Sequence, residues 1–132
     1  MADPVAEAQE LLVDTIETFE KLEVVRALVR GEPRTNQSLA TELGLPETVV
    51  RDACRELQRR RILIEASDGW RLDRGGPRHA ATLALIELYD QDRVGVLNRM
   101  TKIALERIRV NAARTFADAF VLRPKKKDDS DG

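Results

Sequence analysis

The chain has 132 residues, enough for one domain with appendages, and 42% of them are hydrophobic, which is enough for a core. Its 22 basic and 23 acidic side chains leave a formal net charge of −1, so the overall basic excess that is typical of nucleic-acid binders is missing. The single cysteine excludes an internal disulfide framework. No apolar run approaches the roughly 20 residues that cross a bilayer, and the acidic N-terminus lacks a signal-peptide pattern. We therefore expect a soluble, cytoplasmic protein without membrane contact.

The first predicted element is a helical N-terminal arm over residues 4–16. Asp3-Pro4 favours a helix start, because proline lacks the N–H that has no partner at the first helical position. A second helix is expected over residues 18–30, where apolar residues fall three or four apart. Gly31-Glu32-Pro33 ends it, and Arg34 is expected in a short first strand. The acidic side chains of the arm indicate a solvated face.

Two further helices are predicted around a tight turn. The first runs over residues 37–43, and Gly44 can take the left-handed conformation that ends a helix. The second runs over residues 46–60 and begins at Pro46, which suits the first helical position. On each helix the apolar residues at helical spacing form one buried face: Leu39, Ala40 and Leu43 on the first, and Val50, Cys54 (or Ala53) and Leu57 on the second.

A short β-hairpin is predicted to follow, with strands over residues 62–66 and 70–73. The apolar period changes there from helical to alternating, and Asp68-Gly69 is a hairpin turn signal. Trp70 and Leu72 share the face that can close the core. Helix, turn, helix and hairpin predict a mainly α, α+β winged-helix fold. Its helix-turn-helix carries a short hairpin wing and is flanked by an N-terminal helix and a long C-terminal helix.

The stretch SLATELGLPETVVRDACRELQRRRIL and the hairpin after it resemble the winged helix-turn-helix domains of bacterial transcription regulators. The resemblance covers residues 19–78 and implies DNA binding and transcription regulation. It also implies dimerisation through terminal helices. Arg61 stands where such domains commonly have a glycine. Further on, YDQDRVGVLNRM and RTFADAFVLR look like the ends of small, uncharacterised bacterial winged-helix proteins, a similarity that implies no activity.

The C-terminal part reads as helical over residues 80–120, as one helix or two, with residues 90–93 the expected break. A helix this long does not bury its apolar seam alone, so a partner helix is expected. That partner is the N-terminal arm or the same helix of a second subunit, and packing back on the domain is an equal alternative. Pro124 is expected to end the helix. The candidate partner or homodimer interface comprises Leu83, Ile86, Val94, Leu97, Ala104, Ile108, Phe116 and Phe120. The predicted parts are an arm (1–17), a winged-helix domain (18–78), a dimerisation or packing segment (79–122) and a disordered tail (123–132).

The sequence contains no arrangement of residues that is typical of a catalytic site. His79 and Cys54 have no partner residues at useful spacing, and Gly75-Gly76 lacks the lysine and the spacing of a phosphate-binding loop. Asp90 and Asp92 stand without the further ligands that a metal site needs. We expect no catalytic residues, no metal and no cofactor, and we interpret Cys54 as a buried structural cysteine.

DNA binding is the favoured function. Thr48, Arg51 and Arg55 are expected on the exposed face of helix 46–60, where arginine can bond guanine in the major groove. The residues expected to reach phosphates from the strand and wing are Arg34, Arg71, Arg74 and Arg78. Glu47 and Asp52 oppose this interpretation, because both carboxylates would face a polyanion.

The alternative is a winged-helix module that binds a protein through its C-terminal helix and does not bind DNA. The net charge near zero, the short wing and the acidic side chains on helix 46–60 favour it. The Phe116/Phe120 pair, one helical turn apart, would then contact the partner.

Overall fold

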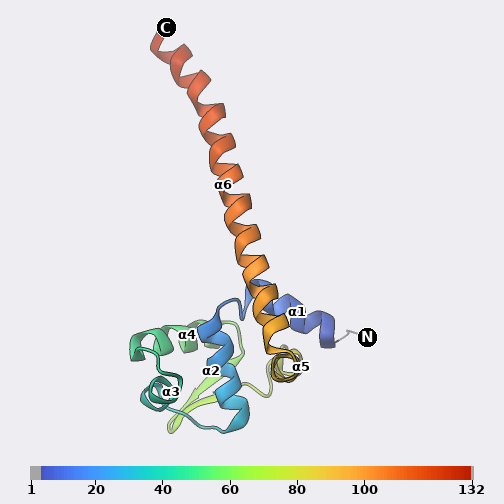
Figure 1. The fold of residues 1–132 in the computed structure, drawn as a ribbon. Helices are drawn as coiled ribbons and strands as arrows, with labels where there is room; N and C mark the ends of the chain where they lie inside the picture. The colour runs from blue at the N-terminus through green and yellow to red at the C-terminus, as the bar shows by residue number, and fades with distance from the viewer. Residues whose placement is uncertain (1–3, 132) are drawn as a thin grey trace. The chain divides into compact units, whose positions relative to one another are not determined.

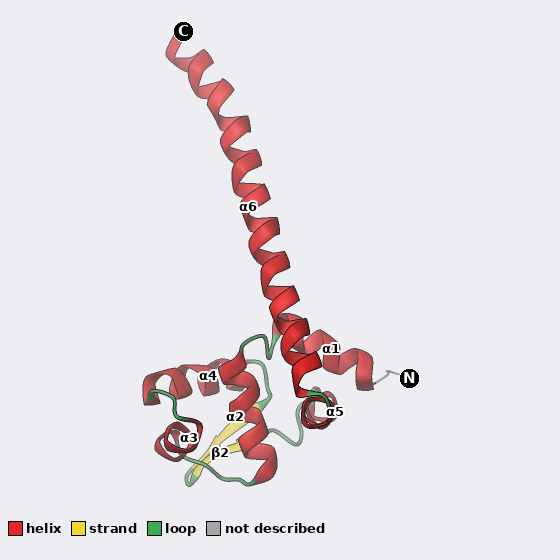
Figure 2. Cartoon of the chain, viewed as in Figure 1, coloured by secondary structure: helices red, strands yellow, loops and turns green. Residues whose placement is uncertain are grey.

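The computed structural model describes the backbone of residues 4–131 and the side chains of residues 6–119. Its contacts divide the chain into two compact units, Met1–Met100 and Thr101–Gly132. The elements, in chain order, are α1 (Pro4–Asp14), α2 (Phe19–Arg30), α3 (Asn36–Leu43), α4 (Glu47–Arg59), β1 (Leu63–Ala66), β2 (Gly69–Leu72), α5 (His79–Gln91) and α6 (Arg93–Asp131) (Figures 1 and 2). The fold is mainly helical with one small antiparallel hairpin, which confirms the winged-helix layout.

Local signals in the sequence set the helix-turn-helix. The Thr35 hydroxyl accepts a hydrogen bond from the Ser38 N–H at 3.1 Å and caps α3. Gly44 ends α3 with φ of 67°, the left-handed conformation expected of it. Pro46 is extended and precedes α4, so it is the N-cap and not the first helical residue as we predicted. The reason is that its ψ of 141° lies outside the helical region, although its φ of −60° fits either position.

The wing is tied to the helices by one tryptophan. In the hairpin Leu63 pairs with Leu72 and Ala66 with Gly69. Trp70 is buried, and its Nε1–H donates to Asn36 Oδ1 of α3 at 2.7 Å. Arg34 forms an isolated bridge with Trp70, which confirms the short first strand. A Cβ at Gly69 would lie 2.6 Å from the Arg34 carbonyl oxygen, so only glycine lets these backbones meet.

The N-terminal arm is part of the body of the first unit. Helix α1 packs along α5, while α2 packs against both α4 and α5. Leu11, Leu12, Leu85 and Ile86 are all buried in this layer. One of the two partners that we expected for the C-terminal segment, the arm of the same chain, therefore covers α5.

A polar cluster around Tyr89 joins α2, α5 and the start of α6. The buried Tyr89 hydroxyl donates to Glu23 Oε2 at 2.9 Å, and Arg93 Nη2 lies 3.6 Å from Glu23 Oε1. The Arg26 guanidinium lies over the Tyr89 ring, 5.7 Å from its centroid, and pairs with Asp90 at 2.7 Å. No local pattern in the sequence indicates this cluster, because its members lie up to 70 positions apart (from Glu23 to Arg93).

The C-terminal segment is two helices. The break falls at Asp92, inside the predicted range 90–93, and Asp92 Oδ1 caps α6 by accepting from the Gly95 N–H at 3.1 Å. Helix α6 then continues to Asp131. The expected stop at Pro124 is therefore wrong, while the separate tail over residues 123–132 stays a prediction. One proline removes a single helical hydrogen bond, and the residues around it, Arg123 and Lys125–Lys127, are strong helix formers.

Arg61 holds a backbone conformation that suits glycine better. Its φ is 61°, and it closes α4 through two bonds, Arg61 N to Gln58 O at 3.0 Å and Ile62 N to Leu57 O at 2.9 Å. We expect Arg61→Gly to raise the free energy of unfolding by about 1 kcal/mol, because the Cβ strain disappears. Urea denaturation measures it. In the matched control, Arg60→Gly, φ is −88° and no strain is relieved, so stability should fall. A loss of stability in both variants would contradict the interpretation.

Tyr89→Phe removes the hydroxyl that donates to Glu23 but keeps the ring. We expect the free energy of unfolding to fall by about 1.5 kcal/mol at neutral pH, a typical value for a hydrogen bond to a charged group. Burial raises the pKa of Tyr89 to about 12, and the bond to Glu23 adds to the rise.

The same pKa sets an alkaline dependence. The unfolded chain loses the tyrosine proton near pH 10 and the folded chain only near pH 12, so the stabilisation is lost as the pH rises through this window. The advantage of the wild type over Tyr89→Phe should therefore shrink from about pH 9 to about pH 12 in parallel urea titrations. A constant difference would show that the hydroxyl is not held by Glu23.

Candidate nucleic-acid interface

Helix α4 presents the three residues that the sequence selected for base contacts. Its apolar stripe, Val50, Ala53, Cys54 and Leu57, is buried against the neighbouring helices, and this orients the opposite face outward. Thr48, Arg51 and Arg55 are all exposed there. Among the described side chains, neither Arg51 nor Arg55 has a hydrogen-bond or ion-pair partner. Both guanidinium groups are therefore available to a ligand.

The acidic residues of α4 divide between two faces. Asp52 and Glu56 line a hollow of about 280 Å³ together with Val49 and residues of α2, and neither Arg51 nor Arg55 lines it. Asp52 lies about 100° around α4 from Arg51 and about 60° from Arg55, on the side of the helix that lines the hollow. Glu47 lies one turn before Arg51 and stays beside it. Of the two carboxylates that opposed DNA binding, one therefore faces elsewhere.

The four arginines proposed to reach phosphates already have partners. Arg34 pairs with Glu42 and donates from Nε to the Gly31 carbonyl at 2.9 Å. Arg71 pairs with Asp68 at 2.8 Å, and this contact lowers the pKa of the Asp68 carboxyl. Arg74 forms an ion pair with Glu32. The Arg78 guanidinium donates a hydrogen bond to the Arg60 carbonyl at 3.2 Å. These arginines are thus less available to DNA than Arg51 and Arg55.

Glu32 is a structural carboxylate that the sequence did not reveal. Its side chain is only 9% exposed, and Oε2 accepts from the Leu72 N–H of β2 at 2.8 Å. It joins the loop after α2 to the wing across 40 residues, and it also holds Arg74. Only its place after Gly31 marked it as a turn residue, so a long-range role had no local signal.

The candidate partner residues divide into exposed and covered ones. Leu83, Val94, Ala104, Ile108 and Phe116 are exposed. Leu97 is half-buried, and the side chain of Phe120 lies outside the described residues. Ile86 is 2% exposed inside the first unit, in the layer where α1, one of the two expected partners, packs on α5. Periodicity alone could not show whether α1 or a second subunit covers this face of α5. Leu105, which we did not select, is also exposed.

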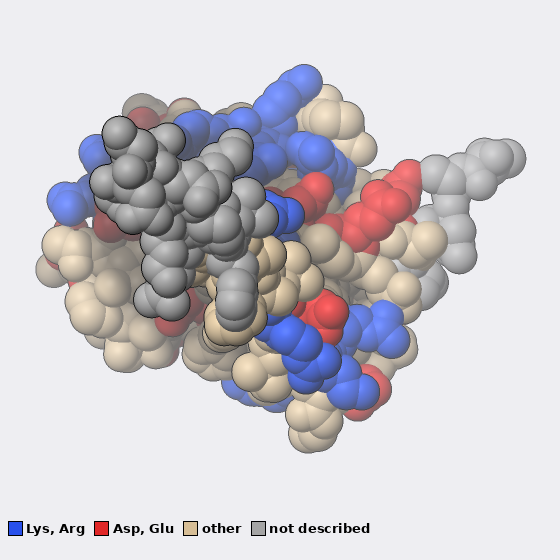
Figure 3. Space-filling model, turned by 90° about the horizontal axis from the view of Figure 1, so that it is seen from above, with Lys and Arg blue, Asp and Glu red and all other residues tan. Residues whose placement is uncertain are grey.

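On the face shown in Figure 3, basic side chains lie among acidic and uncharged ones. No helix within the described residues is long and apolar enough to cross a membrane. The described residues also contain no group of three or more His, Cys, Asp or Glu side chains placed to hold a metal ion. No protein-family model matches this chain, and no curated protein or solved structure matches it either.

Cys54 lies in the apolar stripe of α4, and burial raises the pKa of its thiol to about 12. Since the thiolate is the reactive species, we expect the folded protein to react with a chromogenic disulfide at least about 10³-fold more slowly than the unfolded chain in urea. Absorbance stopped-flow measures both rates. Fast reaction under native conditions would mean that α4 opens far more readily than a packed helix.

Proposed function

We propose that the protein binds double-stranded DNA with α4 in the major groove and acts as a cytoplasmic transcription regulator. The observation that carries this proposal is the pair Arg51 and Arg55, exposed on one face of α4 and without partners among the described side chains. An arginine bonds the O6 and N7 acceptors of guanine bidentately, and the major groove is wide enough for a helix. The Thr48 hydroxyl, on the same face, can bond to a base or a phosphate.

The wing and strand arginines make a smaller contribution in this proposal. Arg34, Arg71 and Arg74 would each have to leave or share a carboxylate to meet a phosphate. Fewer phosphate contacts give a more modest affinity, which agrees with the formal net charge of −1. The expected partner of the protein is thus double-stranded DNA, with most of the contacts made by α4.

The deciding measurement is fluorescence anisotropy of a random-sequence duplex titrated with protein at about 50 and about 200 mM salt. We expect binding at the lower salt that weakens at the higher, and its near loss in the double variant Arg51→Ala, Arg55→Ala. The control removes two arginines that have carboxylate partners, Arg59→Ala with Arg71→Ala, and should lose less affinity. Absence of binding at the lower salt, or equal loss in both variants, would overturn the proposal.

The second candidate is a protein-interaction module, favoured by apolar side chains that α6 leaves exposed. Leu105, Ile108 and Phe116 are 56%, 63% and 65% exposed. An apolar contact of this kind would not weaken steeply with salt, so the same titration separates the two functions when DNA is replaced by the partner. We also propose that the protein is a homodimer, which light scattering tests.

A further inference from the structure

A groove between the start of α2 and the middle of α4 has acidic walls and an apolar floor. It is the hollow of about 280 Å³ lined by Thr18, Glu20, Lys21, Val49, Asp52, Ala53 and Glu56. Val49 is 36% exposed and Ala53 lies beside it. The groove belongs wholly to the first unit, so its geometry does not depend on the second.

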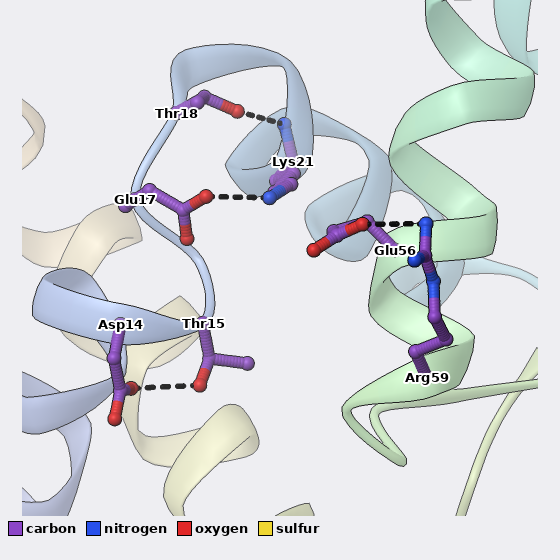
Figure 4. Close-up of polar contacts among 7 residues, drawn as sticks. All are labelled: Asp14, Thr15, Glu17, Thr18, Lys21, Glu56 and Arg59. Carbon is purple, nitrogen blue, oxygen red and sulfur yellow. Dashed lines mark hydrogen bonds and ion pairs between the residues drawn. The ribbon is translucent and has the colours of Figure 1, made fainter.

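The charges around this groove are unequal. The Lys21 ammonium is held by Glu17 at 2.5 Å, and Glu56 meets Arg59 at 2.8 Å (Figure 4). Glu20 and Asp52 have no ion-pair partner among the described side chains. The groove thus keeps an excess of negative charge beside exposed apolar surface, and its ligand should be basic and apolar together.

The second unit carries a segment of this chemistry. Residues 101–119 of α6 have four basic and two acidic side chains. Leu105, Ile108, Ala112 and Phe116 follow at intervals of three, four and four, so they share one face of the helix. Lys102 and Arg109 lie along one edge of this stripe, and both are exposed. Residues 101–119 thus carry one apolar stripe with basic residues along its edge, although Ile103 and Val110 lie on the opposite side of the helix.

We propose that two copies of the chain associate by docking residues 101–119 of each copy into the α2–α4 groove of the other. An amphipathic helix in an apolar groove is a common recognition mode, and opposite charges at the rim set its direction. Two reciprocal contacts related by a two-fold axis close the assembly as a dimer. Pairing the two α6 helices with each other is disfavoured, because it would bring like net charges together.

The docked helix explains the acidic side of α4. Asp52 and Glu56 meet Lys102 and Arg109 of the second copy, while Arg51 and Arg55 lie on the adjoining side of α4, with Arg55 about 60° around the helix from Asp52. The dimer is thus compatible with DNA binding but does not rest on it. Its test uses no DNA, so each proposal can fail alone.

The test exchanges the charges. One full-length variant, Asp52→Lys with Glu56→Lys, has a basic groove and the original basic helix. The other, Lys102→Glu with Arg109→Glu, has an acidic helix and the original acidic groove. We expect each variant alone to associate at least about tenfold more weakly than the wild type, because like charges meet. A mixture of the two should regain the wild-type dissociation constant within a few-fold, since both contacts are then complementary. Sedimentation velocity of the three samples measures this, with far-UV circular dichroism to establish that each variant is folded.

The controls place the same charge changes elsewhere. Glu47→Lys lies on α4 outside the groove, and Arg107→Glu with Arg114→Glu lies on the opposite face of α6 from Leu105. Both controls should associate like the wild type.

Three results would overturn the proposal. The wild type may sediment as a monomer at every concentration. The groove variant may dimerise unchanged while Leu105→Asp abolishes the dimer, which would mean that α6 pairs with α6. Or the mixture may fail to recover although both variants are folded.

Discussion

Burial of the apolar stripe on α4 is the constraint on which the rest of the interface depends. Val50, Cys54 and Leu57 are fully covered, so the rotation of α4 about its own axis is set by the core and not by its polar residues. Full burial of a side chain of this size contributes about 1.5–3 kcal/mol, while an exposed ion pair contributes less than about 1 kcal/mol. The outward position of Arg51 and the sideways position of Asp52 both follow from it.

The polar contacts that hold the other elements in place are of a second kind, because they join residues far apart in the chain. Glu32 connects the loop after α2 to β2, Asn36 holds the indole of Trp70, and Glu23 holds Tyr89 and Arg93. A carboxylate that has lost most of its water must have partners, because an unpaired buried charge costs several kcal/mol. The wing and the α5–α6 corner therefore cannot move without exposing such a group or leaving it unpaired.

These two kinds of constraint explain what the sequence could predict. Helix periods, the Gly44 turn and the break before Arg93 depend on neighbours within four residues, and each was predicted. The partners of Arg34, Arg71 and Arg74 were not predicted, since a sequence shows an arginine but not the carboxylate that folding brings to it. Periodicity placed Ile86 in a seam but could not decide whether the arm or a second subunit covers it, because α1 lies more than 70 positions before Ile86 in the chain. The division into four parts and the roles of the candidate residues stay predictions.

The formal net charge of −1 for the whole chain is a poor guide to its partners. Many of its carboxylates neutralise an arginine or lysine of the same chain, as Glu17, Glu32, Glu42, Asp68 and Asp90 do. Only the charged side chains that have no ion-pair partner within the chain are available to another molecule. On α4 the basic side chains of Arg51 and Arg55 and the acidic side chain of Asp52, unpaired among the described residues, lie on different sides of the helix. Arg51 and Arg55 offer a positive stripe to a polyanion, and Asp52 with Glu20 offers a negative rim to a basic helix. Arg51 and Arg55 are thus turned toward one side of the exposed surface of α4, and Asp52 and Glu56 toward the adjoining side, because the buried stripe sets the rotation of the helix.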